Sequence, residues 1–149
     1  MAFQKVEIHA LSNLVLHEVD PASGYSRRVI EIADNDKEIP MGTVVFRSKG
    51  ASVDTPYSVA TNADIHTGGV LEDVELAVVF GDALKCRGTF TTAISGNTKA
   101  VAFVRGAVQL KDHLIMEALE IADRESDDYK ALKHLLELQG VIIEKTLGA

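Results

Sequence analysis

The sequence predicts a mainly β protein with one or two helices near its C-terminus, an α+β chain that forms a single domain. Short stretches rich in β-branched residues recur between turn residues, at spacings of roughly 8–12 residues. In residues 112–140 the apolar residues change to a helical period. The length of 149 residues is that of one ordinary domain. Short strands at this spacing favour a small β-barrel or a compact assembly of sheets.

The expected strands follow one another along the first half of the chain, at residues 6–9, 14–19, 28–32, 42–47, 57–60, 70–74 and 77–80. The segment Asp20–Gly24 is a turn, because Pro21 has a fixed φ and Gly24 tolerates a positive φ. A second turn is expected at 34–37, and residues 61–69 are expected to form a loop.

A β-hairpin is the clearest local signal. Two β-rich runs, 84–94 and 99–108, flank the polar loop Ser95–Thr98. Each run contains an Arg-Gly pair, Arg87-Gly88 and Arg105-Gly106. Glycine inside a strand often marks a bulge or a close backbone approach.

The last 38 residues predict two helices and a closing strand. Asp112 is expected to cap the first helix, and Ser126 opens the second with acidic residues in its first turn. The apolar faces consist of Ile115, Ala118, Leu119 and Ala122 in the first helix, and of Tyr129, Leu132, Leu135 and Leu136 in the second. Gly140 is placed to end the second helix, and Val141–Glu144 is the expected strand.

Composition and charge exclude several classes of protein. The chain has 15 Lys and Arg against 22 Asp and Glu, a net charge of −7, and the first 75 residues carry most of this excess. Such a chain is a poor candidate for general nucleic-acid binding, which needs clustered cations. The single cysteine excludes an intramolecular disulfide. We expect no signal peptide, no transmembrane helix and no membrane partner, and we expect synthesis in a reducing cytoplasm.

Candidate catalytic and metal-binding residues are few. His113 and Glu117 have the spacing that puts two ligands on one helix face, with Glu120 beside them. The chain has no HExxH pattern and no third ligand that the sequence suggests, so we expect a surface or capping role for His113. Cys86 lies in a β-rich run, where a free cysteine usually behaves as a small buried apolar residue.

Three further motifs do not match the ion-binding or phosphate-binding sites that they partly resemble. The acidic segment 34–38 lacks the Gly and the Glu of a calcium-binding loop. Gly68-Gly69 lacks the Lys and the hydroxyl residue of a phosphate-binding loop, so we interpret it as a turn. Arg27-Arg28 is expected to supply local salt bridges rather than a phosphate site. We therefore expect no enzyme and no cofactor.

Several short motifs follow one another in a characteristic order between roughly residues 13 and 145. The first lie at residues 13–18 and at Tyr25-Ser26-Arg27-Arg28-Val29. The next are Ile39–Val45, which includes Gly42-Thr43-Val44, and Gly68–Val74. The last are Val104–Val108, the helix 127–139 and the strand that starts Gly140-Val141. In this order the motifs resemble those of the phage head decoration protein family.

The resemblance implies a β-tulip-like fold and a structural role in the virion. Such a protein sits as a homotrimer on the outer capsid surface, binds the major capsid protein and stabilises the expanded head. The alternative is a small cytosolic β-barrel enzyme or ligand-binding protein, whose polar centre would be His113, Glu117 and Cys86. A metal-free trimer would favour the first function, and a monomer with stoichiometric metal would favour the second.

Residues 1–16 are expected to form an N-terminal arm or an edge strand, and residues 17–149 the decoration-type domain. As an arm, this segment would make the main capsid contact through its apolar side chains Phe3, Val6, Ile8 and Leu11. A free strand pairs its backbone groups with an exposed sheet edge and places alternate side chains in pockets. The alternative is that it completes the protein's own sheet.

Overall fold

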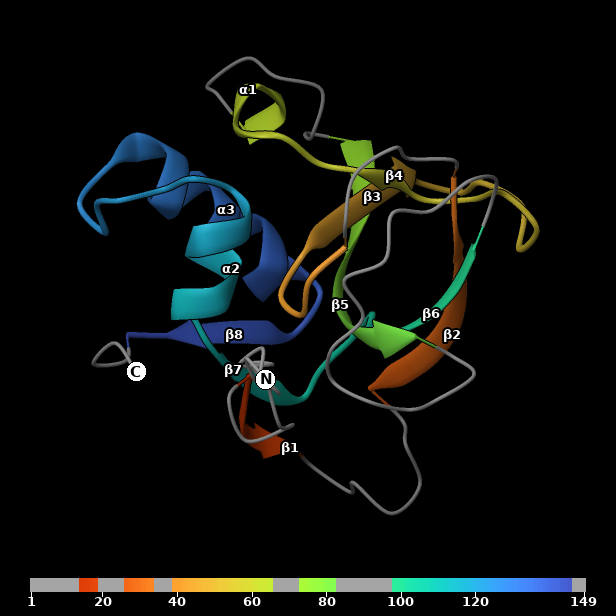
Figure 1. Ribbon diagram of the computed structural model, residues 1–149, viewed down its shortest axis with the longest axis horizontal. Coiled ribbons are helices and arrows are strands. Elements are labelled where there is room, and N and C mark those ends of the chain that lie inside the picture. The colour runs from red at the N-terminus through yellow and green to blue at the C-terminus, as the bar shows by residue number, and fades with distance from the viewer. Residues whose placement is uncertain (1–13, 19–25, 34–38, 66–72, 83–97, 146–149) are drawn as a thin grey trace, which may run out of the picture.

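A computed structural model describes residues 14–18, 26–33, 39–65, 73–82 and 98–145, which form eight strands and three helices (Figure 1). The strands are β1 (Val15–Glu18), β2 (Arg27–Ile32), β3 (Val44–Ser48), β4 (Ser58–Val59), β5 (Val74–Asp82), β6 (Thr98–Phe103), β7 (Val108–Lys111) and β8 (Val141–Glu144). The helices are α1 (Asn62–Ile65), α2 (His113–Ala118) and α3 (Asp127–Leu138). The mainly β prediction and the two C-terminal helices are confirmed.

A three-stranded sheet has the order β1-β7-β8. β1 pairs antiparallel with β7, and β8 pairs parallel with β7 after the chain has passed through α2 and α3. Figure 1 shows these helices and this sheet on one side of the molecule and the five-stranded sheet on the other. Leu14 is fully buried and Val15 pairs with Leu110, so the residues just before position 17 belong to the folded part.

The five-stranded sheet has the order β2-β6-β5-β3-β4. Within the described ranges, its two outer strands come together only where Tyr57, just before β4, bonds to β2. The Tyr57 amide donates to the carbonyl of Glu31 (2.8 Å), and the Ala33 amide donates to the carbonyl of Tyr57 (2.8 Å). The described strands therefore form a curved sheet whose edges touch at one point, and they do not close into the predicted barrel.

Each face of this sheet contributes residues to a buried core. Side chains alternate across the pleat, so Val44 and Leu76 join the core shared with the helices and the three-stranded sheet. Their neighbours Val45 and Ala77 join a second, smaller core inside the curve of the five-stranded sheet. Residues buried on both faces explain why several strands appear in the sequence as apolar runs rather than as clean alternation.

The sequence predicted one strand at residues 99–108, but the structure divides this run between two strands. β6 ends at Phe103, and the chain crosses to the other sheet before β7 begins at Val108. The crossing passes Gly106, where a Cβ would overlap the carbonyl oxygen of Gly140. The predicted partner run, 84–94, lies outside the described residues.

The C-terminal helices differ from the prediction in one respect. Ser126 caps α3 as expected, and its hydroxyl accepts a hydrogen bond from the Tyr129 amide (3.2 Å). Asp112 precedes α2, but its side chain makes no capping bond. It is instead fully buried and accepts hydrogen bonds from Arg124 and from the Tyr129 hydroxyl. α2 is also shorter than expected and ends at Ala118.

Two smaller expectations are wrong. The segment 61–69 was expected to be a loop, but it contains the helical turn α1, in which the Asp64 carboxylate accepts hydrogen bonds from the Thr61 amide and hydroxyl. The strand 77–80 does not start a new element, because β5 runs without a break from Val74 to Asp82. No helix in the described ranges is long and apolar enough to cross a membrane.

Candidate functional site

Arg47 contacts several residues at the end of the five-stranded sheet where β2 and Tyr57 meet. The register of β3 and β5 places Arg47 opposite Glu75, and the Arg47 Nε donates to Glu75 Oε2 (3.0 Å). The guanidinium carbon lies 4.5 Å from the centre of the Tyr57 ring, a cation–π distance. The Arg47 side chain is only 8% exposed, so both contacts operate with little screening by water.

The same guanidinium holds the loop between β3 and β4. Its NH1 group lies within hydrogen-bond distance of the carbonyls of Thr55 (3.2 Å) and Ser52 (3.4 Å). The hydroxyls of Ser52 and Thr55 lie 3.1 Å apart and bond to each other. A planar fork of donors suits several acceptors at once. Arg47 therefore ties this loop to the sheet.

Tyr57 is 3% exposed and fills the space between the two sheet edges. Burial raises the pKa of its phenol, and the nearby Arg47 partly opposes this increase. The phenol is accordingly neutral at physiological pH. Tyr57 therefore acts here as an apolar ring with a polar tip, and not as a base.

Two open hollows flank Tyr57, and both are lined by Tyr57 and Arg28. The seam hollow, about 240 Å³, lies between the β2 edge and the β3–β4 loop; it is lined by Arg28, Val29, Ile30, Glu31, Arg47, Val53, Asp54, Thr55, Tyr57 and Lys99. The mouth hollow, about 280 Å³, is lined by Arg28, Lys49, Tyr57, Glu75, Leu76, Val104, Arg105 and Gln139.

Cations outnumber acids around these hollows. The linings contain five Lys and Arg and three Asp and Glu, a local charge of +2 in a chain of net charge −7. Arg28, Lys49 and Lys99 form no salt bridge with any acidic side chain that the structure describes. Arg27, the neighbour of Arg28, pairs with the buried Glu18 (3.0 Å), so the expectation that this basic pair supplies local salt bridges is confirmed for Arg27 but not for Arg28. The site is thus suited to hold an anionic group beside an aromatic ring.

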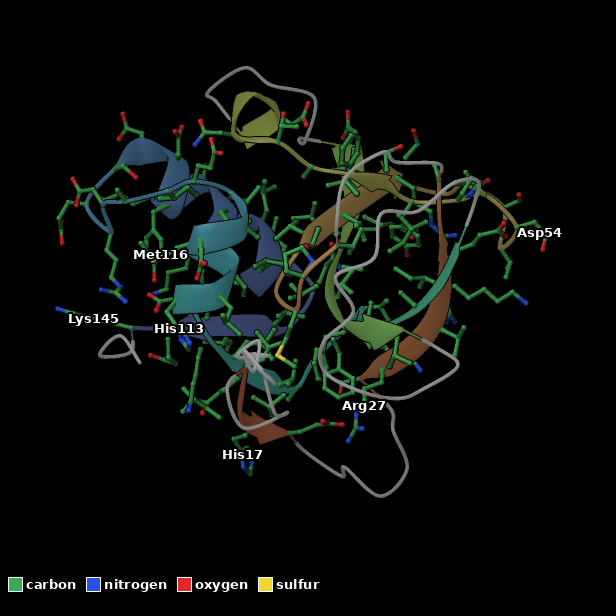
Figure 2. All side chains as sticks on the ribbon, viewed as in Figure 1. His17, Arg27, Asp54, His113, Met116 and Lys145 are labelled. Carbon is green, nitrogen blue, oxygen red and sulfur yellow. The ribbon has the colours of Figure 1, made fainter. Side chains whose placement is uncertain are left out.

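The residues singled out as a possible metal or catalytic centre lie elsewhere. Figure 2 shows His113 on α2, at the opposite end of the molecule from Asp54 in the wall of the seam hollow. Glu117 is exposed, and the described part of the chain contains no group of three side chains that could bind a metal. Cys86 lies outside the described residues.

The proposed capsid-binding residues Phe3, Val6, Ile8 and Leu11 also lie outside the described residues. The sequence did not predict the hollows because their residues come from four strands, β2, β3, β5 and β6, and from the segments that connect strands and helices. The one available signal was an unusual basic pair, Arg27-Arg28, in an acidic half of the chain.

Comparison with known proteins gives no further assignment. No family model, no curated protein and no solved structure matches this chain.

Proposed function

We propose that this chain is a decoration protein of a phage head. It binds the major capsid protein on the outer surface of the virion as a homotrimer and stabilises the expanded shell. The proposal rests mainly on one observation. Two of the segments that resemble that family lie in contact in the folded protein. These are the Arg105-Gly106 segment and the closing segment that starts Gly140-Val141.

The contact between these two segments is direct. Gly106 donates its amide to the Gln139 carbonyl (2.8 Å), and a Cβ on Gly140 would lie 2.9 Å from the Gly106 Cα. β7 and β8 leave this contact as parallel partners, with Val108 opposite Val141. Two short motifs that are unspecific alone therefore form one structural unit, and this supports the resemblance as a whole.

A third segment of the resemblance, Gly42-Thr43-Val44, also has a defined structural reason. Gly42 has a φ of +94° and donates its amide to the Val79 carbonyl, and a Cβ there would lie 2.9 Å from Leu114 on α2. Thr43 donates its hydroxyl to the Pro40 carbonyl (2.7 Å). This segment joins the five-stranded sheet to α2, so its residues serve the same framework.

The capsid contact in this proposal is the N-terminal arm, through Phe3, Val6, Ile8 and Leu11. β1 is an edge strand of the three-stranded sheet, and the buried Leu14 precedes it. An arm that ends at Leu14 would be anchored in the core of the domain. Ordering the arm costs about 1–2 kcal/mol per residue in backbone entropy, so its apolar side chains must be buried on the shell.

The decisive experiment measures co-sedimentation with expanded, DNA-free phage heads. The wild-type chain should sediment with the heads, and a chain that lacks residues 2–11 should fold with an unchanged Tm but remain in the supernatant. His113→Ala is the matched control, because it alters the alternative polar centre and should bind as the wild type does. Absence of wild-type binding would refute the decoration function, and full binding of the deleted chain would refute the arm.

The oligomeric state gives a second test. Light scattering should show a trimer, either in solution or in protein released from isolated head complexes, because a threefold site accepts a closed ring of three copies. A stable dimer in both preparations would contradict the proposal.

A further inference from the structure

The outer edge of β2 has backbone groups to which no other residue in the described ranges bonds. The Glu31 carbonyl points away from β6, because it accepts the Tyr57 amide. In a strand, a residue's N–H and C=O point to the same side, and every second residue repeats that side. The N–H and C=O of Val29 therefore also point away from β6. No described residue bonds to either group.

This open edge lines the seam hollow. Val29 is 56% exposed, and Val53 in the opposite wall is 83% exposed. Alternate residues of a strand face opposite sides of the sheet, and paired residues on neighbouring strands share a face. Arg28 therefore lies on the same face as its buried partner Ala102. Lys99 pairs with Glu31, three residues after Arg28, and so lies on the opposite face. A segment that lies along Val29 thus has a cation on each side of its backbone.

From these observations we propose that the β2 edge binds an extended acidic peptide segment of a partner protein. The segment adds as a strand, pairs with the N–H and C=O of Val29, and places carboxylates against Arg28 and Lys99. Arg28 and Tyr57 line both hollows, so the segment continues into the mouth hollow, where Lys49 meets a further carboxylate. This site is independent of the decoration function, because it rests only on the contacts around β2.

The chemistry of the edge favours a peptide over a nucleic acid. Only a polypeptide presents a regular alternation of N–H and C=O groups to pair with Val29. Arg47 already holds the opposite wall through the Ser52 and Thr55 carbonyls, so little ordering of the loop is needed on binding.

The test uses the full chain and a fluorescein-labelled peptide of four Glu-Val repeats, with binding followed by anisotropy. We expect saturable binding that weakens as salt is raised. A peptide of Lys-Val repeats, and the Glu-Val peptide methylated on every second backbone nitrogen, should each bind at least about tenfold more weakly, because one lacks the carboxylates and the other the ladder. No binding of the Glu-Val peptide, or equal binding of either control peptide, overturns the proposal.

Two variants locate the site. Val29→Pro removes the N–H that faces the open edge and spares the ladder to β6, a position where an edge strand tolerates proline. Arg28→Glu reverses one of the proposed charges, and Lys130→Glu, at an exposed position of α3, makes the same charge change away from the site. Val29→Pro and Arg28→Glu should each weaken binding at least about tenfold, and Lys130→Glu less than about twofold.

If Val29→Pro fails to fold, Arg28→Glu combined with Lys49→Glu replaces it, because both side chains are exposed. Wild-type affinity in either folded variant overturns the assignment of the site. Tighter binding of a ten-nucleotide thymidine strand than of the Glu-Val peptide would overturn the choice of a peptide.

Discussion

The side-chain amide of Gln139 binds the backbone of Leu76 as a neighbouring strand would. Gln139 Nε2 donates to the Leu76 carbonyl (2.7 Å), and Gln139 Oε1 accepts from the Leu76 amide (2.7 Å). The same Nε2 also donates to the Val104 carbonyl (3.0 Å). Because β6 has ended at Phe103, the amide occupies the place beside β5 that β6 would otherwise fill. Gln139, the residue that follows α3, thus links the helical side of the molecule to the five-stranded sheet.

Gln139→Ala should lower the free energy of unfolding by about 2–4 kcal/mol, because it leaves three backbone groups without their partner. Urea unfolding followed by circular dichroism measures the change. Gln109→Ala is the control, on the half-buried outer face of β7, and should change stability by less than about 1 kcal/mol. Equal effects of the two substitutions would show that the Gln139 amide is not a structural link.

The substitutions Gly140→Ala and Gly50→Ala distinguish the energetic cost of close packing from the cost of a left-handed backbone conformation. Both glycines have a positive φ, +81° and +76°, but only Gly140 lies against other backbone atoms, whereas the space around Gly50 is open. Gly50→Ala should cost about 1–2 kcal/mol, the cost of a left-handed conformation. Gly140→Ala should cost clearly more, because the backbone of Gly106 must also move. Chemical denaturation of both variants measures the difference, and similar costs would contradict the close approach.

Asp112 and Ser126 precede the two C-terminal helices but should differ widely in their contribution to stability. Ser126→Ala removes one capping bond and should cost about 1 kcal/mol. Asp112→Ala removes a fully buried carboxylate that accepts from Arg124 and Tyr129, and should cost about 3–5 kcal/mol. Thermal and urea unfolding of the two variants test this order. A cost of about 1 kcal/mol for both would contradict the larger contribution of the buried Asp112 contacts.

Tyr129 should make the fold sensitive to alkali. Burial, together with the hydrogen bond to Asp112, raises the pKa of its phenol to about 12 from an ordinary value of 10.0. Between these pH values the unfolded chain loses the proton and the folded chain keeps it. The resulting stabilisation, about 2–3 kcal/mol for a shift of this size, is complete below pH 10 and is lost as the pH rises towards 12.

The absorbance of tyrosinate during a pH titration measures this pKa directly, and unfolding at a series of alkaline pH values measures the linkage. In Tyr129→Phe the loss of stability above pH 10 should be smaller than in the wild type. An unchanged alkaline profile in this variant would show that Tyr129 does not cause the alkaline loss of stability.

Local patterns in the sequence predicted those strands and helices that are specified by residues close together in the chain. β-branched runs predicted β2, β3 and β8, and the Ser126 cap with its two following acids predicted the start of α3. The helical spacing also identified Tyr129, Leu132 and Leu136 as core residues. Each of these signals depends on side chains within a few positions of one another, where chain connectivity already fixes the distances.

What the sequence by itself determined about this protein is therefore its class, the positions of most described strands and the start of the second C-terminal helix. Only the tertiary structure decided where the run 99–108 divides between two sheets, since that break depends on Gly140, more than thirty residues away. It also decided that Asp112 binds Arg124 rather than the start of α2, and that Arg28, Lys49 and Lys99 gather around Tyr57. These contacts join residues far apart in the chain, and their free energy depends on burial and distance, which exist only once the sheets have packed.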